Sequence, residues 1–227
     1  MNKFDEGLEL FDNKNFEDAR LLFLSCIRDK ENSDASCLYT ALVYIHFEDY
    51  VTAIIYLEKI VNLDGIKNIY YYENAICYKK IGNNTKAISF FHKAILVDQS
   101  DFKSINGFNE LIIKKAYQLF DEDKYAEAMN FYNKVIEHEN NIDFIKYWLA
   151  LCYKCLNDYL NAVKEFRQIV AIENFEDDYY YELGSCYMEL ENYKKALICF
   201  NTAAAINDKN EEYKILIYYL IDRLKKY

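Results

Sequence analysis

The chain has 227 residues, of which 52% are hydrophobic, and carries a formal net charge of −10 at pH 7. Proteins bind the nucleic-acid backbone through clustered Lys and Arg, so this acidity argues against a nucleic-acid partner. Proline is absent and glycine occurs only five times, which favours an almost wholly helical chain.

The cysteine content and the hydropathy pattern indicate a cytoplasmic protein. An odd number of cysteines, seven, is scattered through the helical pattern, which favours reduced thiols over a disulfide framework. Residues 1–15 lack the basic flank and apolar run of a signal peptide. No stretch approaches about 18 uninterrupted apolar residues, so we expect no membrane span.

The dominant feature of the sequence is a repeat of 34 residues. Alanines recur at this spacing in two sets, with a step of 41 residues between the sets: Ala19, Ala53 and Ala87, then Ala128, Ala162 and Ala196. A large side chain follows each alanine by four residues: Phe23, Leu57, Phe91, Tyr132, Phe166 and Phe200. A small residue precedes each alanine by twelve: Gly7, Ala41, Ala75, Ala116, Ala150 and Gly184. Two columns of small residues allow paired helices to pack closely.

Within each repeat, apolar residues recur at spacings of three and four, are interrupted by a polar turn, and then resume, which predicts a helical hairpin. The repeats cover about 1–33, 34–67, 68–98, 99–142, 143–176 and 177–210. We predict that turn residues cap the second helix of each hairpin, namely Asn15, Asp49, Asn83, Asp158 and Asn192, with Asp123 displaced by one place in the fourth repeat.

The fourth repeat contains seven extra residues, around Asp98 to Gly107. One interpretation is a first helix lengthened by about two turns, capped by Ser100 or Asp101. Its apolar residues would be Phe102, Ile105, Phe108, Leu111 and Ile112. The alternative is a loop, which Gly107 favours locally.

The final segment, 211–227, has one apolar stripe, formed by Tyr213, Leu216, Leu220 and Leu224. It predicts a terminal helix that covers the end of the stack.

This pattern resembles the tetratricopeptide repeat, whose signature contains a small residue, an aromatic residue three later, then an alanine and an aromatic residue four later. The resemblance covers about residues 1–210 and implies an all-α fold, a right-handed α-solenoid of six helix-turn-helix units plus a C-terminal capping helix. Two features of the family are missing, because the usual Trp near the start of each unit and the usual Pro between units are replaced throughout.

In tetratricopeptide arrays the first helix of each hairpin lines a concave surface that meets the ligand. The resemblance therefore implies a peptide-binding groove formed by Phe4, Leu8, Leu38, Leu42, Tyr72, Ile76, Ile113, Tyr117, Tyr147, Leu151 and Tyr181. Such a groove suits a protein or peptide partner with an apolar helix or extended segment. The alternative is that these side chains only pack against one another. Some family members hold a C-terminal carboxylate with Lys, Asn and Arg in these columns, and those residue types are absent from them in this chain.

No residue pattern predicts catalysis, and we expect no cofactor and no bound metal. Cys152 and Cys155 form a C-x-x-C pattern inside a helix, where the spacing indicates small core side chains and not a redox motif. His46, His92 and His138 have no His or Cys partner at ligand spacing.

We therefore predict a non-enzymatic adaptor or scaffold for protein–protein interaction. One alternative is a cytosolic chaperone of an exported or membrane-active protein. Another is a structural or self-associating subunit of a larger complex, and a homo-oligomer is compatible with the sequence. The likeness of the third and sixth repeats, each with three consecutive tyrosines, further indicates two blocks of three repeats.

Overall fold

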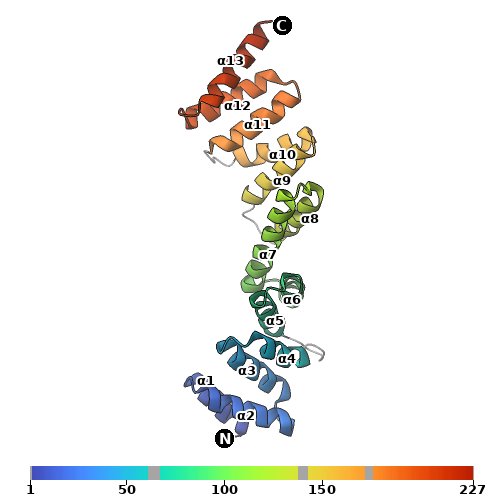
Figure 1. Cartoon of the computed structure of the whole chain (residues 1–227), viewed down its shortest axis with the longest axis vertical. Helices are drawn as coiled ribbons and strands as arrows, with labels where there is room; N and C mark the ends of the chain where they lie inside the picture. The colour runs from blue at the N-terminus through green and yellow to red at the C-terminus, as the bar shows by residue number, and fades with distance from the viewer. Residues whose placement is uncertain (1, 61–66, 138–142, 172–175, 227) are drawn as a thin grey trace. The chain divides into compact units, whose positions relative to one another are not determined.

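The computed structural model describes residues 2–60, 67–137, 143–171 and 176–226. All regular secondary structure in these ranges is α-helical (Figure 1), which confirms the predicted all-α fold class. No helix in the described ranges is long and apolar enough to cross a lipid bilayer. The chain divides into two units, Met1–Leu111 and Ile112–Tyr227.

The described part of the first unit consists of three helical hairpins followed by the first half of a long helix. Its helices are α1 (Lys3–Asp12), α2 (Phe16–Asp29), α3 (Ser33–His46), α4 (Tyr50–Ile60), α5 (Asn68–Lys80), α6 (Asn84–Val97) and the start of α7 (Phe102–Asp121). From α1 to α6 each helix packs against the next one in the chain, so the hairpins form a stack.

The second unit begins within α7, at Ile112. Its further helices are α8 (Tyr125–Ile136), α9 (Asp143–Cys155), α10 (Tyr159–Val170), α11 (Asp177–Glu189), α12 (Tyr193–Ile206) and α13 (Glu211–Lys225). Successive helices from α8 to α13 pack against one another, and α11, α12 and α13 lie side by side in Figure 1.

The small residues that define the repeat lie where the two helices of a hairpin approach most closely. All six repeat alanines are fully buried, and so are the six large side chains that follow them. A Cβ atom on Gly7 would lie 2.8 Å from Cε1 of Phe23, and one on Gly184 would lie 2.9 Å from Cε1 of Phe200. These close contacts explain the glycines in the first column.

Each hairpin turns through one residue in the left-handed region of backbone conformation. These residues are Lys14, Glu48, Gly82, Asp123, Asn157 and Glu191. The following residue stands immediately before the first residue of the second helix, at the N-cap position. Four of the predicted caps are confirmed, because a side-chain oxygen accepts a hydrogen bond from the main-chain amide three residues later: Asp49, Asn83, Asp158 and Asn192. Asn15 makes no such bond, and its side chain donates to Asp18.

The predicted cap at Asp123 is wrong. Asp123 occupies the left-handed position of the turn, with φ of 58°, and Lys124 stands at the N-cap of α8 without a capping side chain. The carboxylate of Asp123 instead accepts a hydrogen bond from the hydroxyl of Tyr125. The displacement by one residue therefore removes the carboxylate from the free amides of the helix start.

The inserted residues lengthen α7 and do not form a loop. The carboxylate of Asp101 accepts hydrogen bonds from the Lys103 amide and the Ser104 hydroxyl at the start of the helix. A Cβ atom on Gly107 would lie 2.5 Å from Cζ of Phe91. Glycine is present here because of close helix packing. Of the apolar residues predicted for this helix, Phe108, Leu111 and Ile112 are buried, whereas Phe102 is 75% exposed.

The predicted terminal helix is present as α13, which packs on α12. Tyr213 and Leu220 are buried on its inner face. The hydroxyl of Tyr213 donates a hydrogen bond of 2.7 Å to Oδ2 of Asp177 at the start of α11. The guanidinium carbon of Arg223 lies 4.4 Å from the ring centroid of Tyr193, a cation–π contact that fastens the end of α13 to α12.

Candidate functional site

The eleven residues predicted to line a groove all lie on the first helix of a hairpin, and all are half-buried. In the first unit they are carried by α1, α3 and α5: Phe4, Leu8, Leu38, Leu42, Tyr72 and Ile76. In the second unit they are carried by α7, α9 and α11: Ile113, Tyr117, Tyr147, Leu151 and Tyr181. They therefore form two surfaces, one in each unit, whose side chains keep part of their area open to solvent.

The five aromatic residues of these surfaces all pack on the second helix of their own hairpin. The ring-centroid distances are 5.7 Å for Phe4–Phe23, 6.0 Å for Tyr72–Phe91, 6.1 Å for Tyr117–Tyr132, and 5.9 Å for both Tyr147–Phe166 and Tyr181–Phe200. Each partner is the fully buried aromatic residue four places after a repeat alanine. One side of each ring thus belongs to the hairpin core, and only the remaining area is accessible to a ligand.

In the second unit the rings join into an aromatic cluster formed by Tyr117, Phe144, Tyr147, Trp148 and Tyr179. Ring-centroid distances are 4.7 Å for Tyr117–Trp148, 6.0 Å for Tyr147–Trp148 and 5.0 Å for Tyr147–Tyr179. Phe144 lies 6.1 Å from Tyr117 and is 53% exposed. The cluster is therefore a chain of ring contacts, mostly edge to face, with one exposed ring at its margin.

Phe144, Trp148 and Tyr179 are not among the predicted groove residues. Phe144 precedes Tyr147 by three residues on α9, and this spacing places neighbouring side chains on a helix surface. That spacing is a signal by which Phe144 could have been identified. Tyr179 comes from α11 and joins the cluster through the stacking of one hairpin on the next, which the repeat pattern does not specify.

Acidic side chains lie close to the aromatic cluster. Burial, together with the neighbouring charges of Glu182, Asp178 and Glu176, raises the pKa of the Tyr147 hydroxyl to about 12. Glu176 and Asp178 are exposed, and Glu182 forms an ion pair with Lys154. We call Glu176, Asp178 and Glu182 the acidic rim. These carboxylates, from α11 and the residue before it, place negative charge beside one part of the cluster.

The last hairpin of the second unit matches a family model described as Tetratricopeptide repeat, over residues 177–210. A TPR repeat-containing protein of Methanocaldococcus jannaschii is 26% identical over 133 residues, which are 59% of this chain and 22% of that protein. Residues 177–210 therefore match a tetratricopeptide repeat, and a longer part of the chain is similar to a tetratricopeptide-repeat protein. The chain spans well under half of the length of the archaeal relative that it matches.

Solved structures are also similar to this chain. The structure of Naa15/Naa10 bound to HypK-THB has a TM-score of 0.65 at 12% identity, over 99% of this chain and 34% of that one. The P58(IPK) TPR domain has a TM-score of 0.47 at 16% identity, over 98% of this chain and 64% of that one. Folds of stacked helical repeats present extended surfaces that support protein–protein interaction.

The two cations beside the predicted columns, Lys79 and Lys154, are held in ion pairs. Nζ of Lys79 lies 2.6 Å from Oε2 of Glu110, and Lys154 pairs with Glu182. The columns themselves contain no Lys, Asn or Arg. The columns therefore lack the residue types with which some tetratricopeptide-repeat proteins hold a C-terminal carboxylate.

A shallow depression lies away from the columns, between α10, α11 and α12. It encloses about 250 Å³ and is lined by Arg167, Val170, Ala171, Leu183, Tyr187, Lys195, Ile198 and Cys199. Ile198 is 66% exposed. An apolar residue at this position of the second helix is the feature of the sequence that could have indicated the depression. The volume is below the usual range for small-molecule sites, about 300–1,000 Å³, and fits a single side chain.

Of the two cysteines in the C-x-x-C pattern, only Cys152 is a core side chain, and the prediction is wrong for Cys155, which is exposed. Cys152 is buried, and burial raises the pKa of its thiol to about 12, which leaves little thiolate near neutral pH. Among the described residues no group of three His, Cys, Asp or Glu side chains is placed to hold a metal ion. His46 stacks on Phe16 at 4.0 Å and His92 lies 5.9 Å from Phe108. His138 lies outside the described residues.

Proposed function

We propose that this protein is a non-enzymatic adaptor that binds an apolar protein segment on its first-helix surfaces, with the aromatic cluster as the main contact. The observation that supports this most is the chain of half-buried rings from Tyr117 to Tyr179, with Phe144 exposed at its margin. Aromatic rings provide large contact area at low entropic cost, and they dominate the binding energy of many interfaces. An amphipathic helix or an extended apolar segment has the matching chemistry.

The acidic rim specifies a further property of the ligand. Glu176 and Asp178 are exposed beside the cluster, so their charges attract a segment that carries Lys or Arg next to its apolar residues. Attraction between exposed charges accelerates association and is screened by salt. The proposed ligand is therefore an apolar segment flanked by basic residues.

The state of the thiols supports a non-enzymatic protein of the cytoplasm. Burial raises the pKa values of Cys77, Cys152 and Cys186 to about 12. Thiols of this kind are poor nucleophiles and act as small core side chains. We assign these cysteines a packing role and place the protein in a reducing compartment.

The aromatic cluster contains the single tryptophan of the chain, Trp148, which makes binding directly observable. We expect a short tryptophan-free amphipathic peptide with flanking lysines to shift the Trp148 emission on binding. The same peptide with flanking glutamates should bind more weakly at low salt, because of the acidic rim. The difference in affinity between the two peptides should become smaller as salt is added, because salt screens the charges of the acidic rim.

Two variants locate the site. Phe144→Ser removes an exposed ring of the cluster and should raise the Kd of the lysine-flanked peptide about tenfold. Leu160→Ser is the matched control, because Leu160 is 71% exposed on α10, a second helix of the same unit. Equal affinity of the two variants for the peptide would exclude the aromatic cluster as the binding site. The absence of any change in Trp148 emission would count against the proposed ligand class.

A further inference from the structure

The helix α13 presents apolar side chains to solvent as well as to the core. Its inner face is buried through Tyr213 and Leu220. On its outer face Tyr218 is 74% exposed, Ile215 67% and Ile221 36%. A helix that only closes a stack needs a polar outer face. The exposed apolar residues therefore indicate that a further surface packs on α13.

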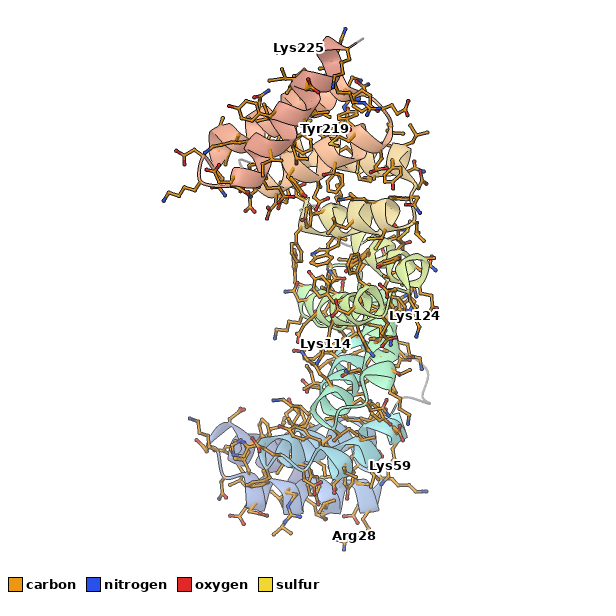
Figure 2. The ribbon with its side chains drawn as sticks, turned by 45° about the horizontal axis from the view of Figure 1, so that its top comes forward. Arg28, Lys59, Lys114, Lys124, Tyr219 and Lys225 are labelled. Carbon is orange, nitrogen blue, oxygen red and sulfur yellow. The ribbon has the colours of Figure 1, made fainter. Side chains whose placement is uncertain are left out.

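The outer face also has an ordered arrangement of charge. Residues at alternating spacings of four and three share this face, and all are exposed: Glu211, Ile215, Tyr218, Asp222 and Lys225. The first turn of the helix is acidic and the last turn is basic. Tyr218 is seven residues from both Glu211 and Lys225. Figure 2 shows Lys225 towards the C-terminal end of α13, beyond Tyr219.

We propose that α13 pairs with α13 of a second copy of this chain, antiparallel and about a two-fold axis near Tyr218. In such a pair the same patch is used by both copies, so the patch must complement itself. Reversal of one helix brings the Glu211 end of each copy level with the Lys225 end of the other. The apolar side chains of Ile215, Tyr218 and Ile221 cover one another at the centre. A parallel pair would place like charges together.

The ion pairs already present on α13 do not oppose this arrangement. Lys214 lies 2.6 Å from Glu211, and Lys226 lies 2.6 Å from Asp222. Both pairs are formed between exposed side chains, and such pairs contribute little to stability. Their partners are therefore free to exchange across an interface.

The size of the contact predicts a weak dimer. A helix of 15 residues is about 22 Å long, and one pair of such helices buries less area than a standard stable interface. The association should therefore depend on protein concentration and should weaken with salt.

Sedimentation equilibrium over a concentration series tests the apolar part of the interface. We expect a monomer–dimer equilibrium whose Kd rises at least about tenfold in the Ile215→Ser, Tyr218→Ser double variant. Leu160→Ser, which removes an exposed leucine from α10, should leave the Kd unchanged, and circular dichroism checks the helix content of all variants. A wild-type protein that stays monomeric overturns the proposal. A dimer that the double variant does not weaken overturns the assignment to α13.

Charge reversal tests the antiparallel orientation. Glu211→Lys and Lys225→Glu should each weaken the homodimer several-fold, because each places like charges at both ends of the pair. A mixture of the two variants should form a heterodimer, and the chain that carries both changes should again form a homodimer. If the mixture and the double variant stay as weak as the single variants, the proposed orientation is wrong.

Discussion

At the scale of single residues, the hairpin turns combine a strained position with a compensating one. The left-handed position holds glycine only at Gly82, and a side chain there costs about 1 kcal/mol relative to glycine. The next residue offsets this cost in most hairpins by capping the second helix. The turn between α7 and α8 has Asp123 in the strained position and Lys124 in place of a cap. This turn and the one between α1 and α2 lack a side-chain cap on the second helix.

A cap introduced at this turn should stabilise the protein. Lys124→Asn places a side-chain oxygen where Asn83 and Asn192 accept from main-chain amides, so the free energy of unfolding should rise by about 1 kcal/mol. The variant loses the exposed pair between Lys124 and Glu122, which contributes little. Urea denaturation followed by circular dichroism measures the change. Lys124→Ala is the control, since it loses the ion pair without gaining a cap, and equal stability of the two variants would contradict the capping argument.

At the scale of the helix, α7 shows how one contact can override a local preference. Glycine in a helix costs about 1 kcal/mol relative to alanine. Gly107 is nevertheless placed where a Cβ atom would meet the fully buried ring of Phe91. The helix therefore accepts a poor helix former so that it can pack closely on α6.

Gly107→Ala should destabilise the protein despite the better helix propensity of alanine. The added methyl group has to displace a buried ring, and overpacking of this kind costs about 1–3 kcal/mol. Asn106→Ala is the matched control, because Asn106 is exposed on the same helix and should be neutral or slightly stabilising. Thermal unfolding of both variants tests this expectation. A Gly107→Ala protein that is more stable than the wild type would show that Phe91 can move aside.

The helices and their small columns were predictable because side-chain size and spacing act locally. The role of Gly107 was not, because its reason is a contact with Phe91, sixteen residues earlier. The same limit applies to the candidate site. The repeat spacing identified Tyr117 and Tyr147, but the cluster with Trp148 and Tyr179 depends on ring orientations and on stacking between hairpins. Whether these rings bind a ligand stays a prediction.

At the scale of the whole molecule, the boundary between the two units falls inside α7, at Leu111 and Ile112, close to the inserted residues. A similar hydrogen bond between an Asn and an Asp side chain is formed in each of the two units. Asn68 at the start of α5 donates to Asp101 before α7, and Asp177 at the start of α11 accepts from Asn207 before α13. These parallels fit two blocks of three repeats. The predicted single array over 1–210 stays a prediction.

Each unit should fold on its own when its closing helix is retained. Residues 1–121 keep three hairpins with α7, and residues 102–227 keep α7 to α13. We expect both fragments to be helical and to unfold cooperatively in thermal melts followed by circular dichroism. A fragment with little helix, or with a broad and gradual melt, would show that the units depend on each other for stability.

The distribution of cysteines allows local unfolding of this protein to be followed by chemical labelling of its thiols. In the native protein Cys155 alone is exposed, whereas Cys26, Cys37, Cys77, Cys152, Cys186 and Cys199 are buried. Three of the buried thiols belong to the first unit and three to the second. A thiol-specific reagent thus begins from a single labelled position, and every further label marks a particular helix that has come away from its neighbours. The order in which the labels accumulate reads out the order in which the repeats separate.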